Sequence, residues 1–161
     1  MLKISFGLVV YNEEKLIERC LKSIKEIADE ILLVHDGPCA DQTVEIAKKY
    51  TDKIFLKDHI GGSDPHRIFL LSQARNDWVF MIDADERVTP ELEASILEAV
   101  KQGPAIWSVN RLCWCFGRYI KHSGMHPDWV PRLYPRNQAR YDATRVHERL
   151  VNNQKLPEQK L

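Results

Sequence analysis

The sequence predicts a single α/β domain in which helices cover both faces of a mostly parallel sheet. Short apolar runs alternate with amphipathic segments over the first 103 residues, and parallel strands need such crossover connections. At 161 residues the chain is long enough for one domain with a core of its own. Its 44% hydrophobic and 29% charged residues are typical of a soluble globular protein and argue against a disordered or collagen-like chain.

Four strands are predicted in this first region. Each is a short and nearly continuous apolar run, as expected of strands covered on both faces. They are KISFGLVV (3–10), EILLVHD (30–36), KIFLK (53–57) and WVFMI (78–82).

Two helices are predicted between the first three strands. The first begins near Glu13, because apolar residues recur at helical spacing after it. These residues are Leu16, Ile17, Cys20, Leu21, Ile24 and Ile27. The second helix is DQTVEIAKKY (41–50), in which Asp41 is expected to cap the free N–H groups of the first turn.

Two further helices flank the fourth strand. The third is predicted from Ser63 to about Arg75, with Ser63 as its cap. Thr89 and Pro90 then give a strong helix start, a cap followed by proline at the first helical position. That helix should end near Gln102, before a Gly-Pro pair.

After Pro104 the helical pattern ends. Residues 105–120 are rich in β-forming residues and predict a long strand or a hairpin. Proline, glycine and histidine interrupt residues 122–135, and RYDATRVHERLV (140–151) suggests one more strand. The polar tail, 152–161, is expected to fray.

Charge and cysteine content narrow the functional classes. The net charge is zero, yet residues 101–150 hold nine Lys/Arg against three Asp/Glu. This asymmetry suits a partner that carries phosphate or another anion, although solvated surface charge would give the same count. The four cysteines form no CxxC pairs and are expected to be core or strand residues. No apolar run reaches the roughly 20 residues of a membrane-spanning helix, and MLKISFGLVV lacks the features of a signal peptide, so a cytoplasmic protein is expected.

Carboxylates cluster directly after the fourth predicted strand. MIDADERVTP (81–90) places Asp83, Asp85 and Glu86 within four positions. Ligands of parallel α/β sheets bind at the carboxyl ends of the strands. A hard cation such as Mg²⁺ or Mn²⁺, holding a substrate diphosphate, would relieve the repulsion among these acids. An acidic turn that is merely solvated is the alternative.

Two further polar motifs should lie at the same edge of the sheet. VVYNEE (9–14) follows the first strand and VHDGPCADQT (34–43) follows the second. Together with DADE, this set resembles glycosyltransferase family 2, the inverting enzymes of the GT-A fold that use nucleotide-diphosphate sugars. The stretches that carry the resemblance span most of the chain. They are VVYNEE, VHDGPCADQTVEIA, DWVFMIDADERVTPEL, DWVPRLYPR and RVHERL.

The last two stretches, at 128–136 and 145–150, resemble the branch of bacterial enzymes that glycosylate lipopolysaccharide core or related envelope glycans. The resemblance implies a GT-A fold with a β-rich acceptor part. It divides the domain, 1–151, into a nucleotide-sugar-binding part (1–103) and an acceptor-side part (104–151), followed by the polar tail.

The resemblance also implies roles for residues of the donor site. Tyr11, Asn12 and Glu13 would border the nucleoside, and Asp36 would accept a hydrogen bond from the base, usually uracil. The second acid that the family commonly has beside this position is here His35. The family's short Gly-Ser turn is replaced by GPCA (37–40), which is expected to alter the base pocket.

The metal and diphosphate contacts follow in the same way. Asp83 would touch the ribose or the metal, and Asp85 would bind the Mg²⁺ or Mn²⁺ that bridges the two phosphates. Arg67 would contact the diphosphate, unless it is only an exposed helix arginine. His147 would be a further metal ligand or a diphosphate contact, unless it is hydrogen-bonded within the sheet.

Inverting transfer needs a base for the acceptor hydroxyl. Asp128, which opens DWVPRLYPR, is the first candidate and Glu148 is the second. Either acid could instead pair with a neighbouring arginine, of which the sequence offers Arg132, Arg145 and Arg149. Trp107, Trp114 and Trp129 are expected in the core, although one could stack on a sugar ring.

The sequence therefore predicts a metal-dependent hexosyltransferase that moves a sugar from a UDP-sugar to an envelope glycan or a lipid-linked acceptor. Nucleic acid is not an expected partner, whereas peripheral contact with the inner face of the membrane and a homo-oligomer are. The first alternative is a nucleotide-sugar-binding module that is non-catalytic or depends on a partner. The second is a nucleotidyltransferase, but YNEE stands where that class would carry a glycine-rich phosphate loop.

Overall fold

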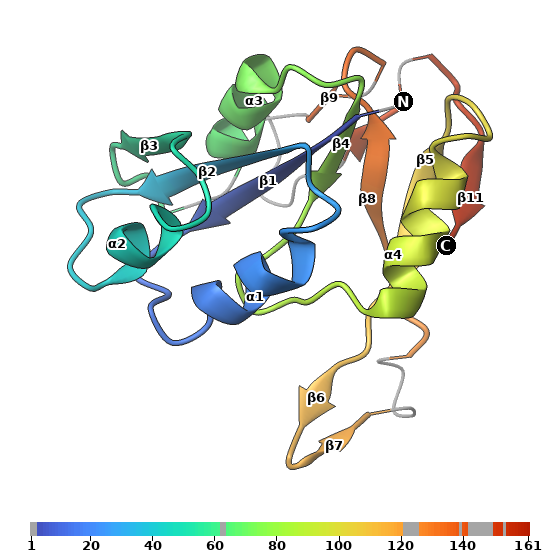
Figure 1. Ribbon diagram of the computed structural model, residues 1–161. Coiled ribbons are helices and arrows are strands. Elements are labelled where there is room, and N and C mark those ends of the chain that lie inside the picture. Colours follow the sequence, from blue (N-terminus) through green and yellow to red (C-terminus); the bar gives the residue numbers. More distant parts are fainter. Residues whose placement is uncertain (1–2, 62–63, 121–125, 139, 142–149, 153) are drawn as a thin grey trace.

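A computed structural model describes residues 3–61, 64–120, 126–138, 140–141, 150–152 and 154–161. The architecture is α/β, as predicted, with a seven-stranded central sheet (Figure 1). The strand order is β11-β5-β8-β4-β1-β2-β3. The bounds are β1 Ile4–Val10, β2 Glu30–Asp36, β3 Ile54–Lys57, β4 Trp78–Met81, β5 Ile106–Asn110, β8 Trp129–Pro135 and β11 Glu158–Lys160.

The four strands predicted in the first region form the parallel half of this sheet. β1 pairs in parallel with both β2 and β4, and β2 pairs in parallel with β3. Every residue of β2 and of β4 is buried, which explains why these strands read as continuous apolar runs. The predicted class and strand positions are confirmed.

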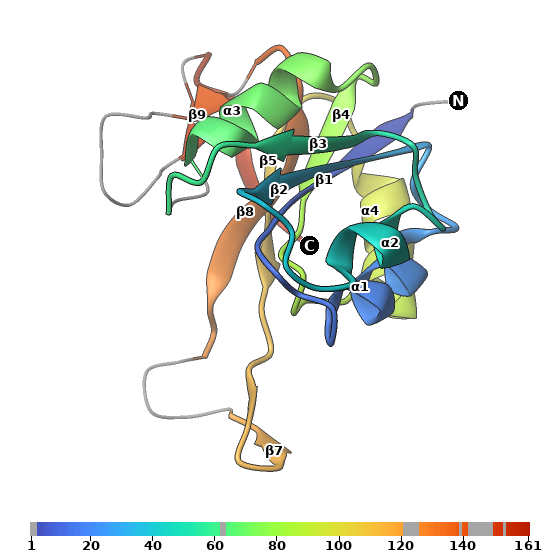
Figure 2. The same ribbon diagram turned by 90° about the vertical axis from the view of Figure 1, so that its left-hand side faces the viewer.

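Helices cover both faces of the sheet (Figure 2). α1 (Ile17–Ile24), α2 (Thr43–Ala47) and α4 (Pro90–Ala99) pack on one face, against a core that includes Phe6, Leu8, Leu33 and Phe80. α3 (Asp64–Gln73) packs on the other face, against residues such as Val79, Met81 and Tyr134. The alternating side chains of each strand therefore supply two separate cores.

The predicted helix starts are partly confirmed. The Thr89 side chain accepts a hydrogen bond from the Leu92 N–H at 3.2 Å and caps α4. The Asp41 carboxylate accepts the Thr43 N–H at 2.9 Å, at the first residue of α2. α1 begins at Ile17, later than predicted. Ser63 lies outside the described residues.

The main departure is β8, which covers residues that the sequence did not assign to any element. This strand lies between β4 and β5 and is antiparallel to both. Its prolines sit where a sheet tolerates them: Pro131 pairs with Ser108 beside a register shift, and Pro135 is the last residue of the strand.

Residues 105–120 contain a strand followed by a hairpin. β5 is followed by β6 (Trp114–Cys115) and β7 (Arg118–Tyr119), which form a separate two-stranded sheet. The single strand predicted at 140–151 is wrong. Its two ends are β9 (Arg140–Tyr141) and β10 (Leu150–Val151), which pair antiparallel with one another.

The expectation that residues 152–161 fray is also wrong. β11 pairs in parallel with β5 and extends the sheet at that edge. The Ile106 N–H donates to the Pro157 carbonyl at 2.9 Å, and the Leu161 N–H donates to the Ser108 carbonyl at 3.0 Å. A polar segment is held here because β5 offers an open row of backbone donors and acceptors.

The prediction that the cysteines are core or strand residues holds for Cys20 and Cys115, but Cys39 and Cys113 lie in half-buried loops. Within the described part of the chain, no helix is long and apolar enough to cross a membrane. The four cysteines are free thiols. Cys20 lies in the core, and its burial raises the pKa of its thiol to about 12.

Candidate functional site

The three polar motifs meet at one edge of the sheet, as predicted. Val10 pairs with His35, and Gly7 pairs with Met81, so the carboxyl ends of β1, β2 and β4 lie side by side. The residues that follow these strands therefore share one surface, at the lower left of the sheet in Figure 1. The order of the strands in the sheet is therefore sufficient to bring the three motifs together.

His35 fixes the loop that follows β1. Its Nδ1 lies 2.8 Å from the Gly37 carbonyl, which can only accept, so Nδ1 carries the proton. Its Nε2 then accepts the Asn12 N–H at 3.2 Å. Asn12 has a φ of 52° and its side-chain carbonyl accepts the Ala40 N–H at 2.9 Å. The histidine thus joins the first two motifs, a role that an acid without a proton could not perform.

A possible metal cluster beside this loop is better explained by hydrogen bonds. Ligand atoms of His35, Cys39 and Asp41 lie within 4.8 Å of one another. Both ring nitrogens of His35 are used, however, and the Cys39 thiol donates to the Asp41 carbonyl at 3.3 Å. The three residues hold the loop together, and no lone pair of His35 is left for a metal.

Asp36 is buried at the end of β2 and surrounded by donors. Its Oδ1 accepts the Ile60 N–H at 2.9 Å and lies 2.8 Å from His66 Nε2. His59 Nδ1 lies 3.1 Å from Oδ2. Burial raises the pKa of Asp36, but the bonds from Ile60 and His66 outweigh it and lower the pKa overall. The Tyr11 ring stacks on His59 with centroids 4.8 Å apart, so a charged acceptor and a flat aromatic pair lie together.

Two arginines hold Asp83. Arg67, from α3, donates to Oδ1 at 2.9 Å, and Arg132, from β8, donates to Oδ2 at 2.6 Å. Arg132 also contacts Glu86, whose carboxylate accepts the Asp83 N–H. Burial raises the pKa of Asp83, but the charge of Arg132 and then Arg67 outweighs it and lowers the pKa overall. Arginines therefore offset the charges of Asp83 and Glu86, whereas the sequence suggested a metal for this role.

Asp85 differs from Asp83 in its surroundings. Its side chain is exposed, and no hydrogen bond or ion pair to it is found among the described residues. It interacts electrostatically with an acid on the loop that follows β1. Burial, and next the charge of Asp85, raise the pKa of Glu13. Negative charge thus remains uncompensated between the ends of β1 and β4, and the available donors are carboxylate oxygens, which suit a hard divalent cation.

Asp128 is anchored by an arginine that the sequence analysis did not consider. Arg111, just after β5, donates to Asp128 Oδ2 from Nε at 2.9 Å, and its Nη2 forms an ion pair with the same oxygen at 2.7 Å. Its Nη1 also reaches Glu86 at 3.5 Å. The expected partner, Arg132, binds Asp83 and Glu86 instead. A chain of alternating charges therefore runs from Asp83 to the predicted acceptor base.

Several predicted residues cannot be placed. His147 and Glu148, with Arg145 and Arg149, lie outside the described residues. The tryptophans divide: Trp107 is in the core, Trp129 is half-buried with the Lys160 ammonium 4.6 Å from its ring centroid, and Trp114 is exposed. The sequence analysis missed the histidines at Asp36 and the arginine at Asp128. The contact of Arg132 with Asp83 depends on β8, and the sequence did not predict that strand.

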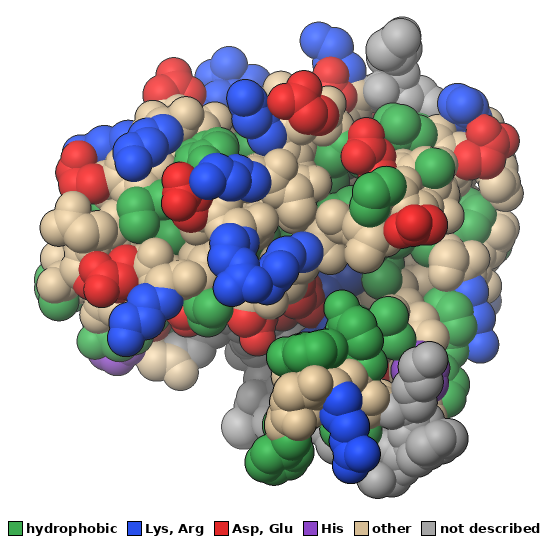
Figure 3. Space-filling view, turned by 60° about the horizontal axis from the view of Figure 1, so that its bottom comes forward, with side chains coloured by type: hydrophobic (Ala, Val, Ile, Leu, Met, Phe, Trp, Pro, Cys, Tyr) green, Lys and Arg blue, Asp and Glu red, His purple; other side chains and the backbone are tan. Residues whose placement is uncertain are grey.

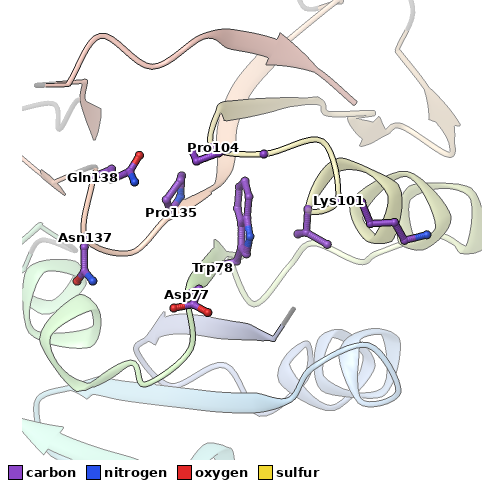
Figure 4. A pocket seen from close by; sticks show the side chains of 9 residues that line it. Asp77, Trp78, Lys101, Pro104, Pro135, Asn137 and Gln138 are labelled. Carbon is purple, nitrogen blue, oxygen red and sulfur yellow. The ribbon is translucent and has the colours of Figure 1, made fainter. Parts of the chain in front are cut away.

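A separate hollow of about 300 Å³ lies at the opposite edge of the sheet (Figure 4). Trp78, Pro104 and Pro135 form its apolar part, with Asp77 and Lys101 beside them. Trp78 begins β4 and pairs with Pro135, so this hollow is at the amino end of the strand whose carboxyl end carries Asp83. It is not part of the site described above.

Comparison with known proteins agrees with this geometry. The model of a family described as Glycosyl transferase family 2 matches residues 5–153. An uncharacterized glycosyltransferase of Rickettsia typhi is 41% identical over 96 residues, which are 60% of this chain and 32% of that protein. The lipopolysaccharide core biosynthesis glycosyltransferase LpsC of Rhizobium meliloti is 29% identical over 157 residues, which are 93% of this chain and 57% of LpsC. The chain thus spans about a third to just over half of the length of these relatives.

Solved structures share the fold. TarS 1-349 of S. aureus in complex with UDP-GlcNAc has a TM-score of 0.65 at 22% identity, covering 88% of this chain and 49% of that chain. Glucosyl-3-phosphoglycerate synthase of Mycobacterium tuberculosis, in complex with Mn²⁺ and UDP, has a TM-score of 0.54 at 21% identity and covers 68% of this chain and 43% of that chain. At these identities the likeness establishes a shared fold.

Proposed function

Because this chain belongs to glycosyltransferase family 2, we propose that it transfers a sugar, with inversion, from a UDP-sugar to an envelope glycan or lipid-linked acceptor. The observation that carries the proposal is the convergence of three strand ends on one surface, with Asp36, Asp83 and Asp85 each in a different electrostatic setting. The lipopolysaccharide role in the name of LpsC, and the UDP-GlcNAc bound to TarS, support the choice of acceptor and donor.

In this proposal the nucleoside lies against Tyr11, Asn12 and Glu13. Asp36 stays ionised, because its hydrogen bonds lower its pKa, and accepts the imide N–H of uracil. His66 and the Ile60 N–H occupy Oδ1. The uracil ring would therefore approach Asp36 from the side of Oδ2, where it would compete with His59 for that oxygen.

Asp85 would hold the divalent cation, which would offset the charge of the leaving diphosphate. The donor set fits Mg²⁺ or Mn²⁺, because the nearby groups are carboxylates whose charges repel one another. Mn²⁺ is present with UDP in the M. tuberculosis synthase. Asp83 would join as a ligand only if Arg67 or Arg132 released one of its oxygens. His147 remains a proposed third ligand.

Asp128 would act as the base. In the transfer, its carboxylate takes the proton of the acceptor hydroxyl while that oxygen forms a bond to the anomeric carbon. The bond from the anomeric carbon to the diphosphate oxygen breaks, and the electron pair leaves with the nucleoside diphosphate. The paired donors of Arg111 would fix the carboxylate in one orientation. Glu148 remains the rival base.

Donor binding tests the site. We expect Asp85→Asn to weaken Mn²⁺-dependent binding of UDP by at least about tenfold, because it removes the exposed metal ligand. Calorimetric titration of UDP, GDP, CDP and ADP, with and without Mn²⁺, measures this change in affinity and identifies the nucleobase that the site prefers. Asp52→Asn is the matched control. Asp52 is exposed and precedes β3, so it lies at the amino ends of the parallel strands, away from the proposed site. Equal metal-dependent affinities in the two variants would refute the assignment of Asp85.

The titration, combined with an assay of UDP release from a UDP-sugar, separates the alternatives. A module that binds a nucleotide sugar without transferring it would bind UDP but release no UDP from a UDP-sugar in the presence of acceptor. The second alternative is a nucleotidyltransferase. Such an enzyme would require a nucleoside triphosphate. Self-association and location at the inner face of the membrane stay predictions, and sedimentation velocity tests the first.

A further inference from the structure

The hairpin formed by β6 and β7 carries exposed aromatic side chains away from the body of the protein (Figures 1 and 2). Among the described residues its strands pair with each other alone, and the rings of Trp114 and Tyr119 pack edge to face with centroids 4.8 Å apart. The exposed fractions are 53% for Leu112, 63% for Trp114, 93% for Phe116 and 53% for Tyr119. Such a concentration of large apolar side chains on one projection marks an interaction surface.

Phe116 is an unfavourable residue for the turn in which it lies. Cys115 pairs with Arg118, so the loop has two residues, Phe116 and Gly117. Their φ values are 52° and 74°. Positive φ at both positions defines a type I′ turn, which favours Asn or Asp before Gly and disfavours a bulky side chain. Neither the turn nor the core benefits from the phenyl ring, so an explanation outside the fold is required.

The hairpin itself carries positive charge only. Residues 112–120 contain Arg118 and no Asp or Glu. Arg111 is paired at the base of the hairpin. Arg118 is exposed and forms no ion pair within the part of the chain that the structure describes. In the space-filling view, hydrophobic side chains gather on the projection with Lys/Arg side chains beside them (Figure 3).

The hairpin is on the same edge of the sheet as the proposed donor site. β8 is antiparallel to both β4 and β5, so the carboxyl ends of β4 and β5 point the same way. The hairpin follows the carboxyl end of β5, and Asp83 follows that of β4. The Arg111–Asp128 pair lies between hairpin and sheet. Whatever binds the hairpin is therefore held on the side where the acceptor must arrive.

We propose that the β6–β7 hairpin docks the protein on the surface of an anionic phospholipid bilayer, with Phe116 inserted and Trp114 and Tyr119 at the level of the headgroups. Trp and Tyr favour this interfacial position, because each has an apolar ring and a polar atom. Arg118, whose charge has no acidic partner among the described residues, is attracted to the anionic lipid. Docking would bring the site to a lipid-linked acceptor; that benefit, though not the docking itself, rests on the proposed function.

A bilayer explains these features better than a soluble glycan does. A sugar ring needs a flat aromatic face flanked by hydrogen-bonding side chains, whereas the residue at the tip is a bare phenyl ring. A protein partner or a second copy would also bury the aromatic rings, but it would not need a segment free of acids. The occupant to which we commit is therefore the bilayer.

Flotation of the 161-residue chain with lipid vesicles tests the proposal. One set contains phosphatidylcholine only, and in the other about one lipid in three is phosphatidylglycerol. We expect binding to the anionic vesicles, weakened by added salt. Phe116→Asn should reduce this binding by about tenfold or more, because the inserted ring is lost. Arg118→Gln should reduce binding to the anionic vesicles by about fivefold.

The Phe116→Asn variant is expected to stay folded, so a loss of vesicle binding would not result from unfolding. Asn is favoured at positive φ, so Phe116→Asn should keep or raise the melting temperature. Leu56→Asn is the matched control. Leu56 is 61% exposed on β3, at the far edge of the sheet from the hairpin, and its replacement should leave vesicle binding unchanged.

Several results would overturn the docking. They are absence of vesicle binding, salt-independent binding, equal binding by wild type and Phe116→Asn, or a dimer in sedimentation velocity that Phe116→Asn dissociates in the absence of lipid. Mn²⁺-dependent titration of UDP on the same variants keeps the two proposals apart. Normal UDP binding with no vesicle binding refutes only the docking, and vesicle binding without UDP binding refutes only the donor site.

Discussion

At the scale of single residues, the site depends on how each carboxylate is paired. Asp83 offsets the charge of Arg132, whose side chain is only 5% exposed, whereas Asp85 faces solvent. We expect Asp83→Asn to lower the free energy of unfolding by about 2 kcal/mol, because it leaves buried positive charge with less compensation. Asp85→Asn should change it by less than about 0.5 kcal/mol. Urea denaturation of both variants measures this, and equal losses would contradict the pairing.

Asp41 makes stability depend on pH. Burial raises the pKa of its carboxyl, but hydrogen bonds from Thr43 and Glu14 outweigh it, and the pKa falls from 3.8 to about 2. A carboxylate whose pKa is lowered by folding stabilises the protein above its unfolded pKa and loses that effect as pH falls through the folded pKa. Between about pH 4 and pH 2, wild type should lose up to about 1 kcal/mol relative to Asp41→Asn. Acid titration of the two proteins, followed by circular dichroism, tests this; parallel curves would exclude the effect.

At the scale of elements, β11 shows how a polar segment becomes a strand. It covers the edge of β5, and Leu161 packs against the core on the side of Ile96 and Trp107. We expect removal of residues 157–161 to lower the free energy of unfolding by about 2–3 kcal/mol, because backbone hydrogen bonds and apolar contact are lost. Urea denaturation measures the loss, and hydrogen exchange at the Ile106 amide locates it. A frayed tail would give no change in either.

At the scale of the whole molecule, the proposed donor and acceptor parts share one sheet. β8, from the acceptor-side part, pairs with β4, from the donor part, and Arg132 on β8 holds Asp83. We therefore expect residues 1–103 alone to remain unfolded, since β4 would keep an open edge and lose core contacts. Circular dichroism of the fragment tests this. In the full chain, unfolding followed by circular dichroism and by tryptophan fluorescence should coincide; a folded fragment would show that the parts are independent.

The α/β class, the four parallel strands and the convergence of three motifs at one edge could all be predicted from the sequence. These features follow from local signals: apolar runs, helical spacing, the cap at Thr89 and the rule that parallel strands need crossovers. Asp36 and Asp83 could be located at that edge for the same reason, since each lies at the end of an apolar run.

The pairing of charges, by contrast, depends on contacts between distant parts of the chain. Arg132 reaches Asp83 across 49 positions of sequence, and His66 reaches Asp36 across 30. Such contacts depend on strand order, and β8 and β11 owe their strand conformation to the open edges of β4 and β5. Their local composition, with prolines in one and polar residues in the other, argues against a strand. Backbone hydrogen bonds to a neighbouring strand do not depend on side-chain type, and for that reason no local pattern could reveal them.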